Sequence, residues 1–298
     1  MKVFCFKINP LIKKTTAITL ALFIGIFLSS VFTLKEDVKS ISAVNTSADS
    51  TGIKLPVFMY HSLLKDKDYQ GKYVISPDMF EKDLIYIKEN GYETVTTKEL
   101  YEYVYKGARL PKKIVMLTFD DGYYNNYVYA YELLKKYHLK AVISPICKMS
   151  EDYSKADDNS PQYGHCTFDD LKEMAQSGVF EIANHSYDMH KTHSRLGVSQ
   201  KSGENQDKYS ETITADIKKA QSLLYKNTGF SPICFTYPFG AYNKKTEEIV
   251  EKLGFTVTLT CTEKLNYITK DKNSLFELGR FLRDEKEETS HLFERIGA

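Results

Sequence analysis

Apolar runs alternate with amphipathic segments along most of the chain. Short and almost uniformly apolar runs at 55–60, 113–119 and 140–146 are typical of buried strands. Between them, apolar positions at helical spacing predict a helix that begins at Pro77 or Asp78 and ends at Glu89. The same alternation predicts further strands at 92–96, 180–186, 232–237, 255–261 and 275–281, and further helices after Thr97, at 124–137, 168–176, 213–225 and 244–253, and at the charged C-terminus.

This order of elements indicates the fold class. Strands that alternate with helices, and whose apolar cores are continuous, indicate an α/β fold with a parallel sheet covered by helices. The number of strands favours a (β/α) barrel of about seven parallel strands over an open sheet, although periodicity alone does not decide between them. The segments 151–166 and 197–210 are polar and lack a regular period. In βα barrels, long loops at the carboxyl ends of strands usually frame the site.

The N-terminus has the features of a membrane-targeting helix. Thr15–Leu34 is uncharged and has about the ~20 residues needed to span a bilayer, and it follows lysines at positions 2, 7, 13 and 14. No small-x-small cleavage site follows, which favours an uncleaved anchor over a cleaved signal peptide. The basic flank predicts that the rest of the chain is extracytoplasmic, anchored to the cell membrane or secreted. The expected parts are a membrane segment 1–34, a polar stalk 35–53 and a folded domain 54–298.

Net charge and cysteine content change this picture little. The formal charge is +1, from 40 basic and 39 acidic residues, so no overall field recruits nucleic acid. Of the five cysteines, Cys5 precedes the membrane segment. The other four, Cys147, Cys166, Cys234 and Cys261, would face an oxidising exterior. They could form one or two disulfides or remain packed free thiols, and the sequence favours neither.

Polar side chains follow several of the predicted strands. Each group has an ordinary interpretation: an Asp-Gly turn, a hydrogen-bonded loop histidine, or a Pro-Gly turn. Because the carboxyl ends of parallel strands meet at one edge, their coincidence there predicts a catalytic site. The groups are His61, Asp120 with Asp121, the histidines His185, His190 and His193, and Tyr237 with Pro238.

Three of these segments resemble the motifs of a known family. "TFDDG" at 118–122, "HSYDMH" at 185–190 and "TYPFG" at 236–240 are similar to motifs of the polysaccharide deacetylases of carbohydrate esterase family 4, the NodB-type domain. The resemblance spans about residues 54–283. It implies a metal-dependent hydrolase that removes N-acetyl groups from a cell-envelope polysaccharide. The family's usual histidine spacing is shorter, and the longer spacing here resembles the poly-β-1,6-N-acetylglucosamine deacetylases, which favours His190 over His193.

The sequence departs from the family pattern in two further places. Thr236 stands where the family has an arginine that orients the catalytic aspartate, and Arg280 is a candidate to replace it, with a plain structural ion pair as an equal alternative. The late motif whose histidine acts as general acid is absent. His61 would supply that group if the barrel is distorted and circularly permuted, as in the poly-N-acetylglucosamine branch.

The resemblance also implies a role for each residue. Asp121, His185 and His190 would hold a divalent metal, with zinc the default and cobalt, nickel or iron as alternatives. Asp120 would be the base, His61 the acid, and the backbone N–H of Phe239 an oxyanion donor. The chain has no Trp, so the expected substrate-binding residues are Tyr123, Tyr187, Tyr237 and Pro238.

The substrate and the competing functions stay open at this point. Poly-N-acetylglucosamine is the first expectation and peptidoglycan the second, with chitin oligomers and acetylated xylan as further candidates. A tethered carbohydrate-binding protein with weak or no turnover is the alternative that Thr236 favours. A two-metal phosphoesterase is disfavoured, because these segments supply few additional ligands.

Overall fold

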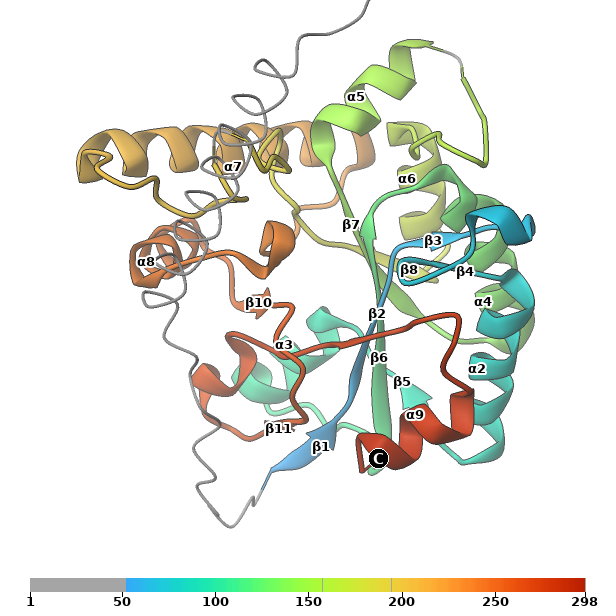
Figure 1. The fold of residues 1–298 in the computed structure, drawn as a ribbon. Coiled ribbons are helices and arrows are strands. Elements are labelled where there is room, and N and C mark those ends of the chain that lie inside the picture. The colour runs from blue at the N-terminus through green and yellow to red at the C-terminus, as the bar shows by residue number, and fades with distance from the viewer. Residues whose placement is uncertain (1–51, 157, 194, 298) are drawn as a thin grey trace, which may run out of the picture. The chain divides into compact units, whose positions relative to one another are not determined.

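The computed structural model describes residues 52–156, 158–193 and 195–297 (Figure 1). The membrane-targeting helix expected within 1–34, and all but the last two residues of the expected stalk, lie outside the described residues. Among the helices that are described, none has the length and apolar character needed to cross a bilayer.

A parallel sheet forms the centre of the fold, with β6 (Ile114–Asp121) in its middle. All eight residues of β6 are buried, because strands flank it on both sides and side chains cover both faces. The register pairs Tyr60 with Phe119 and Asp120 with Ser144, so the carboxyl ends of these strands meet at one edge. The sheet order is β12 (Phe281–Leu282), β2 (Val57–Tyr60), β6, β7 (Ala141–Pro145) and β8 (Phe180–Ile182), and β5 (Glu93–Thr94) also pairs with β6.

Three further strand pairs complete the described strands. β9 (Cys234–Thr236) and β10 (Val257–Leu259) are parallel to each other. Isolated bridges join Asn184 to Phe235 and Leu259 to Leu278, in the segments that follow β8 and precede β12. The other pairs are β1 (Ile53–Leu55) with β11 (Asn266–Ile268), and β3 (Ser62–Leu63) with β4 (Val74–Ile75). The predicted α/β fold with a parallel sheet is confirmed, whereas its closure into a barrel stays a prediction.

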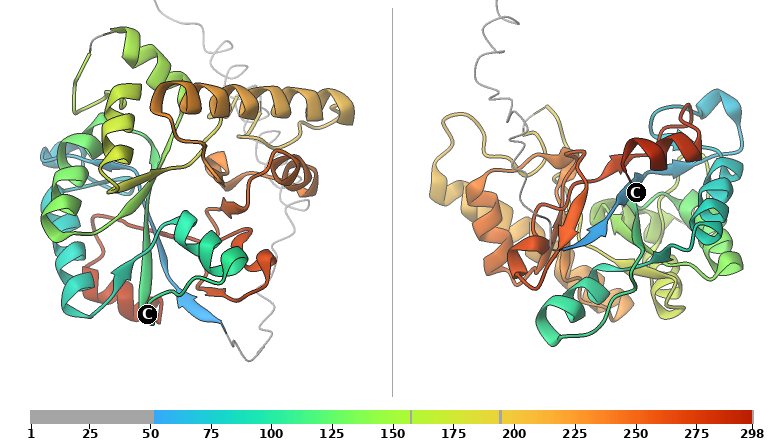
Figure 2. Two further views of the ribbon diagram at one scale, coloured as in Figure 1. Left: turned by 180° about the vertical axis from the view of Figure 1, so that it is seen from behind. Right: turned by 90° about the horizontal axis from the view of Figure 1, so that it is seen from below.

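Helices cover the outside of the sheet (Figure 2). α2 (Pro77–Glu89) begins as predicted: the Ser76 side chain accepts from the Met79 N–H, and Pro77 takes the first helical position. Figure 1 shows α2 and α4 together on one side and α7 and α8 on the other. The remaining helices are α3 (Thr97–Lys106), α4 (Glu132–Tyr137), α5 (Cys147–Ala156), α6 (Phe168–Gln176), α7 (Gln206–Thr228), α8 (Lys244–Lys252) and α9 (Thr289–Arg295).

The alternation of side chains along β6 explains how an apolar strand can end in two acids. Leu117 and Phe119 pack in the core beneath the helices, whereas Met116 packs in a second core on the other face. By the same alternation Asp120 faces that second side. Asp121 has φ 67°, in the left-handed region that side chains rarely adopt, and this breaks the alternation. Both carboxylates therefore line one cavity.

Several predicted boundaries were wrong. The segments expected to lack structure contain α5 and the first residues of α7, because their polar residues lie on exposed helix faces. The strand predicted at 275–281 forms only at Phe281–Leu282, and Lys272–Leu275 is a 3₁₀ helix. The helix predicted at 124–137 has the predicted bounds, although its middle, Asn126–Tyr131, is π-helical and precedes α4. The four described cysteines are free thiols.

Candidate active site

A buried ion pair holds the first of the two acids. Arg280, just before β12, donates from Nη1 to Asp120 Oδ1 at 2.7 Å and from Nη2 to Oδ2 at 2.8 Å. Its Nε donates to the Thr260 carbonyl at 2.8 Å, and its side chain has no exposed surface. Burial alone would raise the pKa of Asp120, but the Arg280 guanidinium outweighs it and lowers that pKa. Asp120 is therefore kept ionised by Arg280, the residue that the sequence offered as a candidate for the arginine missing at Thr236.

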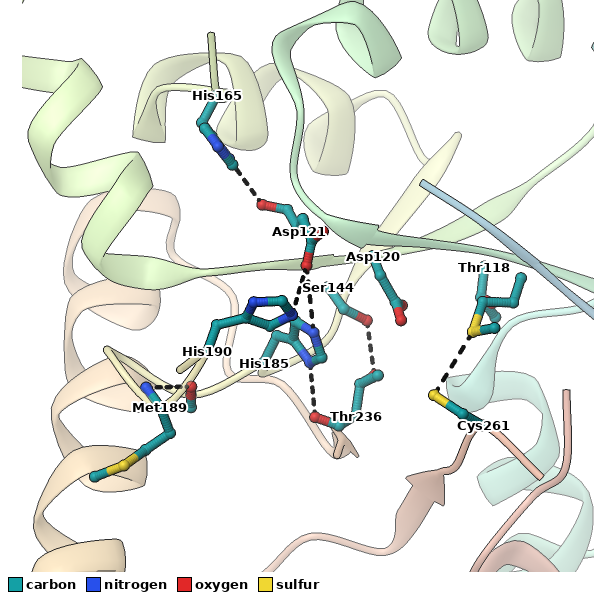
Figure 3. A network of polar contacts seen from close by, with 12 residues as sticks. Thr118, Asp120, Asp121, Ser144, His165, His185, Met189, His190, Thr236 and Cys261 are labelled. Atoms are coloured by element: carbon teal, nitrogen blue, oxygen red, sulfur yellow. Dashed lines mark hydrogen bonds and ion pairs between the residues drawn. The ribbon is translucent and has the colours of Figure 1, made fainter. Parts of the chain in front are cut away.

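The second acid lies against two imidazoles (Figure 3). Asp121 Oδ1 is 3.2 Å from His190 Nε2 and 3.6 Å from His185 Nε2. One ligand atom from each residue lies within 4.8 Å of the others. Burial would raise the pKa of Asp121, but the nearby imidazoles of His185 and His190 lower it well below its ordinary value. The predicted trio is thus brought together, although its members lie on two segments more than sixty residues apart.

These three side chains fit a divalent metal. The atoms Asp121 Oδ1 and His185 Nε2 are buried and have no hydrogen-bond partner, as expected of atoms reserved for an ion. His185 Nδ1 donates to the Thr236 carbonyl at 2.8 Å, which leaves the Nε2 lone pair free to coordinate. One carboxylate and two imidazoles are the ligands of catalytic sites that keep open positions. His193 is exposed on the loop beyond, and its Nδ1 contacts the Thr192 hydroxyl at 3.4 Å.

A cavity of about 680 Å³ opens over the two acids. His61 lines it because alternation along β2 places Met59 and His61 on the cavity side. His61 Nδ1 is buried without a partner, and burial lowers the pKa of this imidazole despite the charges of Asp120 and Asp121. Phe239 lines the opposite part, with its ring centroid 4.1 Å from that of His190 and its backbone at φ 58°.

The expected substrate-binding residues divide. Tyr123 lines the cavity, as predicted. Tyr237 does not: alternation along β9 turns it with Phe235 into the core beneath α7 and α8, with 0% exposure, so the prediction that it contacts substrate was wrong. Tyr187 also lies outside the cavity lining, where its hydroxyl donates to Glu151 at 2.7 Å. Pro238 is buried beside Phe239 and does not line the cavity.

Other residues of the site were missed from the sequence. His165 Nδ1 donates to the Asp121 carbonyl at 3.0 Å, and its ring stacks on Tyr123 at 4.8 Å. Ser144 and Thr236 share a hydrogen bond of 2.7 Å in the polar layer beside the two acids. The "GHC" around His165 lies in a polar segment with no strand before it, so no pattern pointed to it.

The fold and the site together define a class of protein: an α/β protein with an Asp, His, His trio at the carboxyl edge of a parallel sheet. A family model described as polysaccharide deacetylase matches residues 107–258, half of the chain. The chain therefore belongs to the polysaccharide deacetylase family, and the class of enzyme expected from the sequence is confirmed at the level of the family.

Named relatives and solved structures agree with this assignment. The protein YxkH of Bacillus subtilis (strain 168), whose name places it among polysaccharide deacetylases, is 32% identical over 70% of this chain and 64% of its own length, which is less than two thirds. A poly-beta-1,6-N-acetyl-D-glucosamine N-deacetylase of Staphylococcus aureus (strain MRSA252) is 29% identical over 80% of this chain and 76% of its own. The structure of the Streptococcus pyogenes deacetylase PplD in complex with acetate superposes with a TM-score of 0.68 and 26% identity, over 83% of this chain and 99% of that one.

Proposed function

We propose that this protein is a metal-dependent hydrolase that removes N-acetyl groups from a cell-envelope polysaccharide. The observation that carries the proposal is the pairing of Asp120 with Arg280 directly beside the trio of Asp121, His185 and His190. This arrangement separates the two neighbouring acids into two roles, because each carboxylate has its own positive or metal-binding partners. The distorted barrel is part of the proposal, supported by the Asn184–Phe235 and Leu259–Leu278 bridges and by the place of β2 between β12 and β6, as expected for a circular permutation.

Poly-N-acetylglucosamine is the first-choice substrate and peptidoglycan the second. The S. aureus relative, named for the first polymer, spans most of this chain. The position of His61 after the first strand of the sheet and the selection of His190 support the same choice. An N-terminal anchor, with the folded part outside the cytoplasm, would bring the enzyme to either polymer.

The residues around the cavity permit amide hydrolysis. A divalent ion held by Asp121, His185 and His190, with zinc as first choice, would supply Lewis acidity for the attack of water on the acetamide carbonyl. Asp120, kept ionised by Arg280, would take the proton of the attacking water. The backbone N–H of Phe239 would donate to the developing oxyanion, and His61 would protonate the departing nitrogen.

The alternative function, an inactive carbohydrate-binding protein, is no longer supported by the missing arginine. It was favoured by Thr236, since the family's orienting arginine is missing there. Arg280 makes the bidentate contact to Asp120 from another strand, and no observation now favours an inactive site.

The proposal is tested by measuring bound metal and acetate release from β-1,6-linked N-acetylglucosamine oligomers and from peptidoglycan. We expect Asp120→Asn to keep its metal and lose turnover by about 10²–10⁴-fold, and His190→Ala to lose both. His193→Ala is the matched control and should keep both, because His193 is exposed and outside the trio. Metal retained in His190→Ala but lost in His193→Ala would contradict the assigned ligand, and wild-type protein without acetate release would contradict the function.

A further inference from the structure

One wall of the cavity carries two tyrosines whose rings are left half in solvent. The wall is the segment 62–75, which follows His61 and contains β3 and β4. Tyr69 and Tyr73 both line the cavity, with 58% and 50% of their surface exposed. Most large apolar side chains of the described residues are buried. Aromatic rings that stay exposed inside a cavity therefore indicate a ligand-binding surface.

Buried contacts hold this wall in place. The Asn125 side chain, fully buried, accepts from the Leu63 N–H at 2.9 Å and donates to the Ser62 hydroxyl at 2.9 Å. The Ser62 N–H donates to the Tyr73 carbonyl at 3.1 Å. The backbone beneath Tyr73 is therefore fixed before a ligand arrives, which lowers the entropy cost of binding.

The Tyr73 ring lies beside the proposed general acid. Its centroid is 5.0 Å from that of His61, with the rings at 68°. On the other side of the site, Phe239 is 39% exposed against His190. Aromatic rings thus flank the reacting centre on both sides, and the apolar C–H face of a pyranose packs on such rings.

We propose that Tyr73 is the stacking platform for the sugar unit next to the one that is deacetylated, on the side of His61. The ligand is a neutral N-acetylhexosamine unit of a polymer. The inference rests on the proposed function for the identity of the polymer.

The test compares Tyr73→Ala, Tyr73→Phe and the control Tyr225→Ala on a β-1,6-linked N-acetylglucosamine tetramer and on the monomer. Tyr225 is 61% exposed on α7 and does not line the cavity. We expect Tyr73→Ala to raise the KM for the tetramer about tenfold with little change in kcat, because stacking is lost equally in the ground and transition states. Tyr73→Phe and Tyr225→Ala should stay near wild type, as should the monomer with every variant.

Calorimetric binding of the tetramer separates failure of this inference from failure of the function. Wild-type turnover with an unchanged tetramer KM in Tyr73→Ala overturns the platform alone. Tetramer binding that depends on Tyr73, without acetate release, supports the platform and overturns the deacetylase proposal. Absence of both binding and turnover in the wild type overturns both.

A second, independent observation concerns the loop between the two histidines of the trio. His185 and His190 are five residues apart, and a continuous helix would turn their rings well away from one another. Ser186 has φ 70°, a left-handed conformation that turns the backbone between the two histidines. Asp216, on α7, then accepts from two successive N–H groups of this loop, that of Tyr187 at 2.8 Å and that of Asp188 at 3.0 Å.

We infer that Asp216 is a positioning residue that sets His190 against Asp121. Successive N–H groups that point to one side form a nest for an anion, and a carboxylate with one oxygen on each N–H fixes the path of the chain. The two bonded N–H groups, those of Tyr187 and Asp188, are each two residues from one of the histidines. Asp216 is not among the residues that line the cavity, so its effect on a bound metal must pass through the loop.

The test replaces Asp216 with Asn, which has no charge and offers one acceptor oxygen where Asp216 uses two, and takes Glu211→Gln on an exposed face of α7 as the control. The readouts are the dissociation constant for Co²⁺, the visible absorption spectrum of the Co²⁺-loaded protein and the melting temperature without metal. We expect Asp216→Asn to bind Co²⁺ about 10–100-fold more weakly with an altered spectrum, as for other residues that orient metal ligands. A lower melting temperature with wild-type affinity and spectrum would show a merely structural role and overturn the inference.

Discussion

At the scale of residues, the site depends on how the buried carboxylates of Asp120 and Asp121 find positively charged or metal-binding partners. Two adjacent acids at the end of a strand repel unless each finds a partner. The resemblance implied a metal on Asp121 and offered Arg280 as a candidate partner of Asp120. The structure separates them: Asp120 has Arg280, and Asp121 faces the two imidazoles. Burial sharpens both effects, since Asp120 and Arg280 are almost wholly removed from water.

Breaking the Asp120–Arg280 pair should damage stability and turnover together. We expect Arg280→Gln to lower the free energy of unfolding by about 3–5 kcal/mol, because it leaves a buried carboxylate without its partner. It should lower kcat more than tenfold and leave the dissociation constant of the metal nearly unchanged, which denaturant unfolding, acetate release and metal titration would measure. In a double-mutant cycle, adding Asp120→Asn should cost less than the sum of the single changes. Strict additivity would mean that the two side chains do not interact.

At the scale of elements, alternation and helix capping decide which way each side chain faces. Ser76 and Thr96 cap α2 and α3, and both helices begin as their sequences predict. Alternation along β2 and β9 sends His61 into the cavity and Tyr237 away from it. The error at Tyr237 arose because β9 is buried on both faces, so its residue types do not show which face meets the cavity.

A pair of acids between α8 and the segment before β12 should make stability depend on pH. Glu247 has a pKa raised to about 7, by partial burial and by a hydrogen bond to Glu277. The folded state therefore binds a proton more tightly than the unfolded chain, so the stability from this group is full below the ordinary glutamate pKa of 4.5 and is lost as pH rises towards about 7. We expect the melting temperature of wild type to fall over this range relative to Glu247→Gln. Glu251→Gln, an exposed change on the same helix, should reduce the slope only in part, because the charge of Glu251 is a lesser cause of the raised pKa of Glu247 than burial and Glu277.

At the scale of the whole molecule, contacts between distant parts of the chain form the central sheet and hold the C-terminal helix against it. β2 lies between β12 and β6, so the first and last parallel strands of the described chain are neighbours. Below them, Asp83 on α2 accepts from Arg283 Nε at 2.8 Å, from the Thr289 hydroxyl of α9 at 2.6 Å and from the Tyr60 hydroxyl at 3.0 Å. This buried network ties the C-terminal helix to the first long helix of the folded domain.

Removing Asp83 should loosen that tie without touching the site. We expect Asp83→Ala to lower the free energy of unfolding by about 3–5 kcal/mol, because Arg283 is fully buried and would lose its counterion. The dissociation constant of the metal should stay at the wild-type value. Glu81→Gln is the control: this acid lies on the same helix and pairs with the exposed Lys136, so its loss should cost at most about 1 kcal/mol. Equal effects of the two changes in denaturant unfolding would contradict the assigned importance of the buried network.

The sequence by itself determined the succession of strands and helices, the edge that carries the polar groups and the candidates Asp121, His185, His190 and His193, because those depend on local periodicity and on residue types at strand ends. His190 could be preferred over His193 only through family resemblance, since no local rule fixes a loop of this length. Tertiary structure alone decided that Arg280 meets Asp120 across 160 positions, that Asp216 clamps the loop of His185 and His190, and that Tyr73 borders the cavity. The physical reason is that such contacts arise from how the elements pack in three dimensions, and the pattern of apolar and polar residues along the chain records only which face of each element is buried.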